Sequence, residues 1–392
     1  MRLFDELVWR GLVQDSTEGL GEALDAGPLT LYVGYDPTAP SLHAGNLQQV
    51  ITMRRFQLRG HRVIALAGGG TGLIGDPSGK SAERALQAES TVAEWAQRIE
   101  GQMRRLLPDD TLFLNNREWL EPLSAIELLR DVGKHFPMGY MLAKESVKTR
   151  VHGEGMTFTE FAYMLLQSYD YQQLFDREGC RLQMGGSDQW GNITAGIELI
   201  RRTRTERVHG LTTPLLLRAD GQKFGKSEEG AIWLDPERTS PFQFFQFFLN
   251  TADDQVGMLL RRLTLFDREE IERLEAAPPE TREAQRALAE HLTKMLHGEE
   301  GLRAAEEQTR ALFAGEGDAE AVEVGGDALA SWPHVFLAAG LVSSLSEARR
   351  LVSGGGLYAD DERLTEDSPP PARGDEVVLR KGKRERRAVR LV

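Results

Sequence analysis

Residues 29–47, LTLYVGYDPTAPSLHAGNL, contain the pattern that decides the fold of the first part of the chain. Apolar and polar residues alternate over residues 29–35, which predicts a short strand. Pro37 ends this strand, because proline cannot donate a hydrogen bond to a sheet and turns the chain. Ser41 is a suitable cap for a helix that continues with helical spacing over residues 48–58. The stretch therefore predicts a strand, a tight turn and a helix.

The helix start after this turn carries His43, Gly45 and Asn46. A helix start presents free N–H groups and the positive end of the helix dipole, and both favour phosphate. An ordinary strand-to-helix crossover with a chance histidine explains the same residues. The stretch alone leaves both interpretations open.

Strands and helices continue to alternate through residue 235, which predicts an α/β domain with a Rossmann-like parallel sheet. Ligands of such sheets bind at the carboxyl ends of the strands. The further strands are expected at residues 62–67, 111–114 and 180–184, and the further helices at residues 91–106, 122–133, from Thr157 onward, and 193–201.

The composition describes a globular protein without a membrane segment. Of 392 residues, 41% are hydrophobic, and no apolar run approaches the length that spans a bilayer. The N-terminus has no basic segment followed by a long apolar one, so no secretory signal is expected. A single cysteine, Cys180, excludes an internal disulfide and fits a reducing cytoplasm. We therefore expect a cytoplasmic protein.

Three further regions follow residues 1–235. Residues 236–314 are helical and rich in charge, which predicts an all-α domain. Residues 315–331 are acidic and glycine-rich and are expected to form a linker. Residues 332–392 predict a small α+β domain. The net charge of the chain is −13, yet residues 371–392 hold eight Lys or Arg against three Asp or Glu. This asymmetry suggests a polyanionic partner, although a solvated surface hairpin explains the charge equally well.

The glycine-rich run at residues 68–81 partly matches the dinucleotide-binding fingerprint and the P-loop, but it satisfies neither motif. The dinucleotide fingerprint requires an acidic residue at the end of a strand, and the acidic residues that follow this run lie in helical sequence. The first glycine of a P-loop would fall at Ile74. The run still offers the carboxylate of Asp76 and the cations Lys80 and Arg84.

Two more stretches offer groups for a binding site. Tyr163, Gln167 and Asp170 stand at i, i+4 and i+7, so they share one face of a helix. Such a face can line a pocket or form a solvated polar stripe. Lys223 and Lys226 lie in a short loop and can neutralise charge on a leaving pyrophosphate, although exposed lysine pairs are usually only solvated.

Taken in order, these motifs resemble those of bacterial tyrosyl-tRNA synthetases, over nearly the whole chain. His43-Ala-Gly-Asn46 resembles the HIGH signature, and residues 223–227, KFGKS, resemble the KMSKS signature. Residues 75–80, 163–170 and 185–192 match the remaining signatures. Two departures are visible. Asn46 replaces the second histidine of HIGH, and Phe-Gly replaces Met-Ser in the second motif.

The resemblance implies a role for each matching residue. Tyr32 and Asp170 would hold the substrate phenol, and Asp76, Tyr163 and Gln167 its ammonium group. Gln189 would lie near the carboxylate, Asp188 near the ATP ribose, and Gly34 and Asp36 alongside both substrates. The residues expected around the ATP phosphates are Thr38, His43, Gly45, Asn46, Lys80, Arg84, Lys223 and Lys226. No residue is assigned as a metal ligand.

The implied reaction is the activation of L-tyrosine by Mg-ATP, followed by transfer of the tyrosyl group to the 3′ end of tRNA(Tyr). The resemblance also implies a homodimer, with residues 135–144 in its interface, and a C-terminal RNA-binding domain. Two other hypotheses stay open. One is a tryptophan-activating relative, against which Tyr32 and Asp170 argue because an indole has no para hydroxyl. The other is a non-catalytic RNA-binding protein, which would not need the phosphate-site residues.

Overall fold

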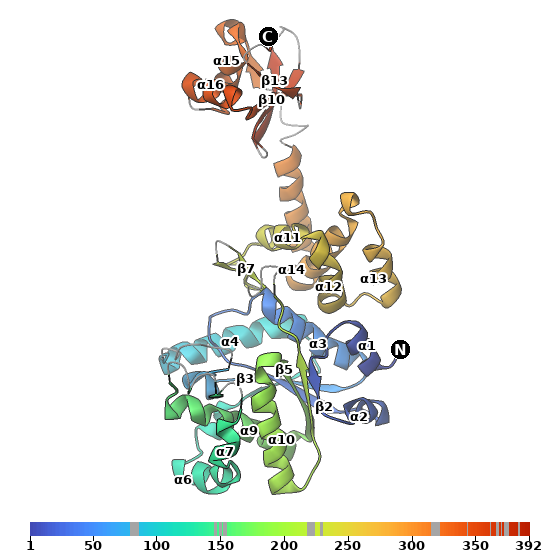
Figure 1. Ribbon diagram of the computed structural model, residues 1–392, viewed down its shortest axis with the longest axis vertical. Helices are drawn as coiled ribbons and strands as arrows, with labels where there is room; N and C mark the ends of the chain where they lie inside the picture. Colours follow the sequence, from blue (N-terminus) through green and yellow to red (C-terminus); the bar gives the residue numbers. More distant parts are fainter. Residues whose placement is uncertain are drawn as a thin grey trace. The chain divides into compact units, whose positions relative to one another are not determined.

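The computed structural model divides the chain into two compact units, Met1–Leu302 and Arg303–Val392 (Figure 1). It describes residues 1–78, 86–144, 147–148, 151, 155–217, 224–227, 230–314, 322–342, 344–360, 362–365, 368–369, 371, 376–382 and 385–392. Lys80, Arg84 and Lys223 lie outside these residues, and only the backbone of Lys226 is described. Each unit is built around its own sheet.

The first unit contains a six-stranded sheet in the order β1-β6-β5-β2-β3-β4. All neighbouring strands are parallel except β1, which pairs antiparallel with β6 at the edge. The expected α/β class with a parallel sheet is therefore confirmed. The strands are β1 (Asp15–Ser16), β2 (Thr30–Tyr35), β3 (Arg62–Ala67), β4 (Leu112–Asn115), β5 (Cys180–Gly186) and β6 (His209–Thr213).

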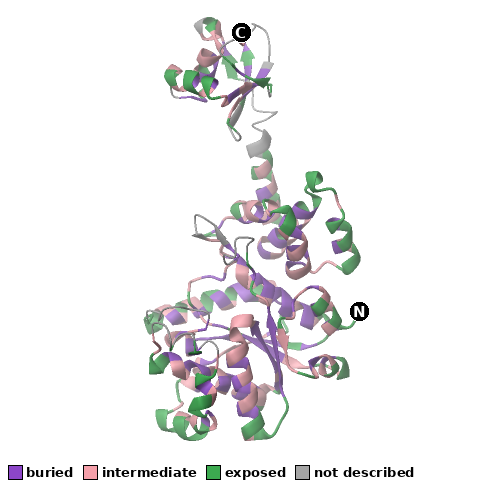
Figure 2. Ribbon diagram, in the orientation of Figure 1, coloured by how far each residue is buried: buried purple, intermediate pink, exposed green. Residues whose placement is uncertain are grey.

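Helices pack against this sheet and bury it. Helices α3 and α4 contact β3, whereas α9 and α10 contact β5 and each other. From Val63 to Ala67 every residue of β3 is buried, as expected for a central parallel strand (Figure 2). These and the N-terminal helices are α1 (Leu3–Trp9), α2 (Leu20–Ala26), α3 (Leu47–Leu58), α4 (Glu89–Leu106), α9 (Phe158–Glu178) and α10 (Trp190–Arg204).

The structure contains the predicted helix cap at Thr157 but not the one at Ser41. Thr157 and Glu160 form the expected capping box at the start of α9. Ser41 does not cap α3. A short 3₁₀ turn, η1 (Ala44–Asn46), precedes that helix, and His43 caps the turn. The Ser41 hydroxyl donates instead to the Leu42 carbonyl.

The helix expected at residues 122–133 is broken into short pieces. Ser124 caps a new helix start together with Glu127, and a π-helical turn follows. The side chains of Val132, Phe136 and Met141 are thereby buried against α9 and α10. The pieces are α5 (Arg117–Leu120), α6 (Ala125–Glu127), η3 (Leu128–Val132), η4 (Gly133–His135) and α7 (Met138–Leu142).

The rest of the first unit is mainly helical. Ser240 caps α11 with Pro241 in its first position, as predicted, and Phe244, Phe245 and Phe248 are buried in the core. Helix α14 is kinked at Gly298. Within the described chain, no helix is both long and apolar enough for a membrane span. The elements are β7 (Lys226–Ser227), β8 (Gly230–Ala231), α11 (Pro241–Leu249), α12 (Asp253–Leu263), α13 (Arg268–Glu275), η6 (Pro279–Thr281) and α14 (Glu283–Ala314). Helix α14 continues past Leu302, so residues 303–314 belong to the second unit.

The second unit forms a five-stranded sheet in the order β11-β10-β12-β13-β9. The expected basic hairpin around Gly382 is present as β12 and β13. The structure differs from the expected linker at residues 322–331, because β9 pairs parallel with β13 and η7 packs on the same core. The elements are β9 (Val322–Val324), η7 (Gly326–Ala330), α15 (Trp332–Ala338), α16 (Leu345–Ser353), β10 (Leu357–Ala359), β11 (Glu362–Arg363), β12 (Glu376–Lys381) and β13 (Glu385–Leu391).

Candidate active site

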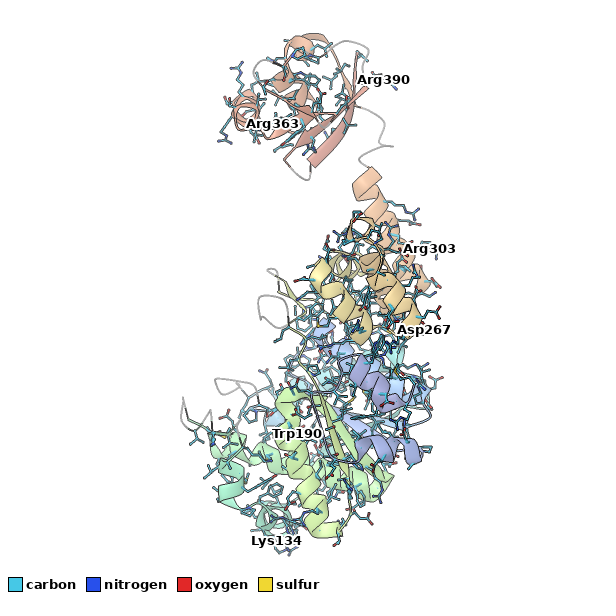
Figure 3. All side chains as sticks on the ribbon, turned by 45° about the vertical axis from the view of Figure 1, so that its right-hand side comes forward. Lys134, Trp190, Asp267, Arg303, Arg363 and Arg390 are labelled. Carbon is cyan, nitrogen blue, oxygen red and sulfur yellow. The ribbon has the colours of Figure 1, made fainter. Side chains whose placement is uncertain are left out.

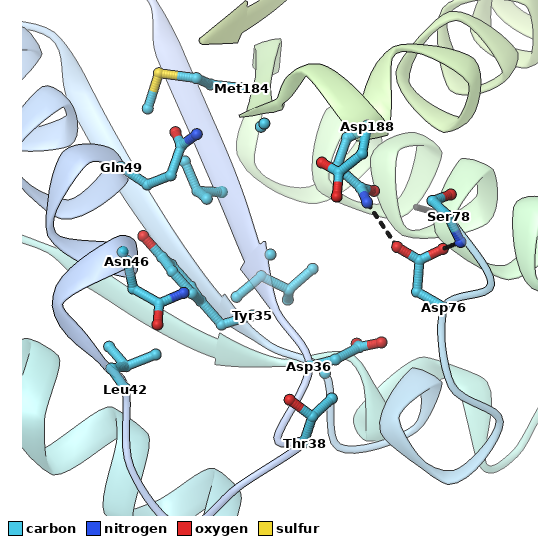
Figure 4. A pocket seen from close by; sticks show the side chains of 18 of the residues that line it. Tyr35, Asp36, Thr38, Leu42, Asn46, Gln49, Asp76, Ser78, Met184 and Asp188 are labelled. Carbon is cyan, nitrogen blue, oxygen red and sulfur yellow. Dashed lines mark hydrogen bonds between the residues drawn. The ribbon is translucent and has the colours of Figure 1, made fainter. Parts of the chain in front are cut away.

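A cavity of about 420 Å³ opens at the carboxyl ends of β2, β5 and β6 in the first unit. Figure 4 shows Asp36 and Thr38 in its wall between Asn46 on one side and Asp76 on the other. The cavity brings together every predicted site residue whose side chain, or glycine position, is described. These residues are Tyr32, Gly34, Asp36, Thr38, His43, Gly45, Asn46, Asp76, Tyr163, Gln167, Asp170, Asp188 and Gln189.

The inner end of the cavity is formed by the hydroxyl of a tyrosine side chain and the carboxylate of an aspartate. Tyr32 from β2 and Asp170 from α9 are 1% and 2% exposed. Within the described part of the chain, Tyr32 Oη has no hydrogen-bond partner. A buried polar atom of this kind costs free energy unless a ligand or water meets it. The inner end is therefore suited to a ligand group that can both donate and accept a hydrogen bond.

Asp170 is held in place by two donors that the sequence did not single out. Its Oδ1 accepts a hydrogen bond from Trp119 Nε1 at 2.7 Å, and its Oδ2 accepts one from Asn116 Nδ2 at 2.9 Å. Burial raises the pKa of Asp170 to about 7, although both hydrogen bonds act to lower it. Asn116 directly follows β4, and a polar residue at the carboxyl end of a parallel strand was a usable signal.

Asp36 forms a second group of contacts at the end of β2. Its Oδ2 accepts a hydrogen bond from Tyr163 Oη at 2.7 Å, and its Oδ1 accepts one from Thr71 Oγ1 at 2.7 Å. Tyr163 is buried, and its pKa is raised well above its usual value, chiefly by burial and then by the nearby carboxylates. The Tyr163 hydroxyl therefore remains protonated and donates to Asp36.

Asp76 sits among amide side chains on the facing wall. Gln189 Nε2 donates to Asp76 Oδ2 at 2.6 Å, and the Ser78 backbone N–H donates to Oδ1 at 2.9 Å. Asn192, which the sequence did not assign, donates to Gln167 Oε1 at 2.9 Å. Carboxylate and amide oxygens thus line this wall, and together they suit a cationic ligand group.

The outer end of the cavity is built on the turn before α3. The Gly45 N–H donates to His43 Nδ1 at 3.0 Å, so the neutral imidazole carries its proton on Nε2. Asn46 Oδ1 accepts from the His43 backbone N–H at 3.0 Å. The departure at position 46 is therefore accommodated locally, because the asparagine side chain closes the turn as a capping residue.

The loop around residue 225 is attached to this turn by backbone hydrogen bonds. Ala44 N donates to the Ile232 carbonyl, and Ile232 N donates to the Gly225 carbonyl. A Cβ atom at Gly225 would lie 3.0 Å from Gly45 N, and the φ angle of Gly225 is +83°. Glycine is required there for both reasons. Phe224 is buried and packs on Phe248, so both residues of the altered second motif have a structural role.

Comparisons with known proteins identify the family of the chain. The family described as "tRNA synthetases class I (W and Y)" matches residues 24–314. The tyrosine–tRNA ligase of Bacillus caldotenax is 48% identical, over 98% of this chain and 98% of its own length. That of Roseiflexus castenholzii is 47% identical, over 100% of this chain and 99% of its own.

A solved structure shows the same arrangement of elements. A C-terminally truncated mitochondrial tyrosyl-tRNA synthetase of Aspergillus nidulans superposes with a TM-score of 0.73 at 30% identity, covering 80% of this chain and 94% of its own. Similarity of sequence and of structure therefore point to one family. The chain belongs to the tyrosyl-tRNA synthetases, which are class I aminoacyl-tRNA synthetases.

Proposed function

We propose that this chain joins L-tyrosine to tRNA(Tyr) in two steps within the cavity of the first unit. The tyrosine carboxylate attacks the α-phosphorus of Mg-ATP, which forms tyrosyl-adenylate and expels pyrophosphate. The 3′-terminal ribose hydroxyl of the tRNA then attacks the tyrosyl carbonyl and releases AMP. The observation that carries the proposal is the arrangement of one cavity. The buried pair Tyr32 and Asp170 lies at its inner end, and the His43 turn before α3, which suits phosphate, lies at its outer end.

The phenol hydroxyl of the substrate would complete the inner end. Tyr32 Oη, which lacks a partner among the described residues, would donate to the phenol oxygen, and the phenol O–H would donate to Asp170. The ring of the substrate would lie along β2. A substrate without the hydroxyl leaves these buried groups unpaired, and tyrosyl-tRNA synthetases are themselves the established example of strong discrimination on that basis. Tryptophan carries no hydroxyl at this position.

The ammonium group of the substrate would bind among Asp76, Gln167 and Tyr163. Because Tyr163 donates its only proton to Asp36, its oxygen can only accept from a ligand in the cavity. Asp76 contributes negative charge, and Gln189 beside it would contact the substrate carboxylate. These groups favour an α-amino acid over a neutral phenol.

No protein nucleophile is needed in the first step, because the substrate carboxylate is already ionised. Catalysis would come from positioning and from charges directed at the transition state. His43 Nε2–H and the Thr38 hydroxyl would meet the γ-phosphate, with Gly45 and Asn46 beside them, and Asp188 would contact the ribose. Gly34 offers open space at the cavity wall, because a Cβ atom there would meet nothing within 4 Å. Lys80, Arg84, Lys223 and Lys226 are proposed to surround the pyrophosphate.

ATP–pyrophosphate exchange tests this function directly. The purified chain should exchange label with tyrosine and give at most weak exchange with tryptophan or phenylalanine. Exchange with tryptophan in preference to tyrosine would identify the tryptophan-activating alternative. No exchange with any amino acid, together with RNA binding, would identify the non-catalytic alternative.

The second unit is proposed to bind the tRNA. Exposed arginines lie on its surface, and Figure 3 shows the side chains of two of them, Arg363 and Arg390. Arginine and lysine bind phosphates without reading sequence. Ending the chain after residue 314, ahead of β9, should leave exchange intact and reduce tRNA charging at least tenfold at physiological salt. Equal charging by the shortened chain would remove the sheet of the second unit from the mechanism.

A homodimer is proposed from an apolar surface on the first unit. Six large apolar side chains among the described residues between 126 and 158 are at least 42% exposed, which is unusual for one stretch. They include Met138 and Leu142, which fall within the interface region expected from sequence. The six are Ile126, Leu129, Met138, Leu142, Val151 and Phe158.

Sedimentation tests the homodimer. Wild type should sediment as a dimer, and the double variant Met138→Lys, Leu142→Lys should sediment as a monomer. Leu58→Lys is the matched control, because Leu58 is also exposed but ends α3 away from this stretch. A monomeric wild type, or a double variant that stays dimeric, would contradict the proposal.

A further inference from the structure

The Thr71 hydroxyl and the Asn116 amide connect two carboxylates of the cavity, those of Asp36 and Asp170. Thr71 Oγ1 lies 2.7 Å from Asp36 Oδ1 and 2.8 Å from Asn116 Nδ2. The same Asn116 nitrogen lies 2.9 Å from Asp170 Oδ2. We propose that Thr71 is a positioning residue that couples recognition of the substrate ammonium to recognition of its phenol. This inference rests on the proposed function.

The direction of every hydrogen bond in this chain of contacts is determined. The Gly70 backbone N–H can only donate, and it donates to Asn116 Oδ1 at 2.8 Å. The amide nitrogen of Asn116 therefore faces Thr71 and Asp170, with one hydrogen for each. Asn116 is 1% exposed, so water does not compete for these contacts.

The direction of the Asn116 hydrogen bond also determines where the Thr71 hydroxyl donates its proton. Because Thr71 Oγ1 accepts from Asn116, its own proton is directed to Asp36 Oδ1. The other oxygen of Asp36 accepts from Tyr163 Oη. Tyr163 then has no proton to offer the cavity, and it must accept from the ligand. Thr71 thus sets the position of Asp36, and through it the acceptor character of Tyr163.

The same contacts reach the phenol end. Asn116 presents one amide hydrogen to Thr71 and the other to Asp170. Without the Thr71 hydroxyl, the amide keeps only its bonds to the Gly70 N–H and to Asp170, so it can shift, and the carboxylate of Asp170 with it. Chains of hydrogen bonds in a buried site strengthen one another, so the two ends should bind cooperatively.

Close packing supports this role for the glycine-rich run. A Cβ atom at Gly68 would overlap Asp36 Oδ1 and would lie 2.7 Å from Thr71 Oγ1. Backbone hydrogen bonds tie Gly68 to Tyr35 and Gly72 to Gly68. The run that resembles a phosphate loop in sequence therefore wraps the Thr71–Asp36 contact, and its first glycine makes room for it.

The test compares Thr71→Val, which keeps the shape and removes the hydrogen bonds, with Thr71→Ser, which keeps the hydroxyl. Dissociation constants are measured for L-tyrosinol, L-phenylalaninol, 3-(4-hydroxyphenyl)propan-1-ol and 3-phenylpropan-1-ol. These four ligands carry both recognition groups, either one, or neither. They form a cycle that yields the factor by which one group strengthens binding of the other.

In wild type and Thr71→Ser this factor should be roughly three- to tenfold, within the range of groups that share a network. In Thr71→Val it should fall to about one. Thr71→Ala serves as a second test if the valine variant does not fold, as judged by its melting temperature. An unchanged factor, or an equal loss of affinity for all four ligands, would overturn the inference. Absence of tyrosine-dependent exchange in wild type would instead count against the proposed function.

Discussion

The two ends of the cavity are constructed differently. At the inner end, buried side chains position one another: Asp170 accepts from Asn116 and Trp119 before any substrate arrives. At the outer end, the His43 turn is closed by backbone groups and by Asn46. Discrimination between similar amino acids needs groups fixed in advance, because the cost of an unpaired buried group provides it. Phosphate binding tolerates a looser turn, since charge acts over longer distances.

Removal of Asp170 should give the largest effect and would test whether the inner end carries the discrimination. Asp170→Ala should lower kcat/KM for tyrosine by roughly a thousandfold or more, because it removes a charged acceptor and leaves Asn116 and Trp119 unpaired. The loss should appear mainly in tyrosine binding, measured by equilibrium titration. Normal tyrosine activation by this variant would show that the phenol is read elsewhere.

Removal of His43 should separate the two ends. His43→Ala should slow tyrosyl-adenylate formation by roughly tenfold to a thousandfold, about 1.4 to 4 kcal/mol, with little change in the tyrosine dissociation constant. Thr38→Ala should act in the same sense. Single-turnover kinetics measure the rate and the dissociation constant separately. If His43→Ala weakened tyrosine binding and left the rate unchanged, its assignment to the phosphates would be wrong.

The pH dependence of selectivity should sharpen the comparison further. Because the pKa of Asp170 is raised to about 7, a proton neutralises this acceptor as the pH falls through that value. The preference for tyrosine over phenylalanine in kcat/KM, which reports the free enzyme, should then fall roughly two- to tenfold between pH 8 and pH 6.

The variant Trp119→Phe is the matched control for this titration. It removes a hydrogen bond that lowers the pKa of Asp170, so the midpoint should move to higher pH. A preference that does not change with pH in either protein would contradict the ionisation of Asp170 in this range.

Asn46 should give the smallest effect. Asn46→Ala leaves the His43 backbone N–H without its acceptor, which costs about 1 kcal/mol for a capping residue and so a few-fold in adenylation rate. Asn46→Asp keeps the acceptor but adds negative charge beside the phosphates, so it should slow the reaction more than alanine does. A faster aspartate variant would show that position 46 acts only on the turn.

Local patterns in the sequence were enough for much of the fold and of the site. The strand at residues 30–35, the capping box at Thr157 and Glu160, and the shared face of Tyr163, Gln167 and Asp170 each depend on residues a few positions apart. Such features follow from strand and helix periodicity.

What was missed depends on tertiary contacts. Asn116 and Trp119 meet Asp170 only because β4 lies beside β3 in one register. Residues 322–324 read as linker because their partner, β13, is at the end of the chain. The glycine-rich run was interpreted through its polar residues, whereas its structural role comes from Thr71 and from the absence of a side chain at Gly68. The place of Asn116 at the end of β4 marks it as a candidate, but which groups these residues meet cannot be inferred from spacing along the sequence.

The backbone bonds between the His43 turn and the later loop have a consequence for how the protein matures. Leu234 N donates to the Leu42 carbonyl, and Ala44 N to the Ile232 carbonyl, so residues separated by most of the first unit close the proposed nucleotide site together. Contacts between such distant segments form only after a large loop has closed. During synthesis, the amino-acid end can assemble once α10 has emerged from the ribosome, because Gln189 and Asn192 follow α9. The nucleotide end must wait for residue 234, so a partly made chain should recognise its amino acid before it can activate it.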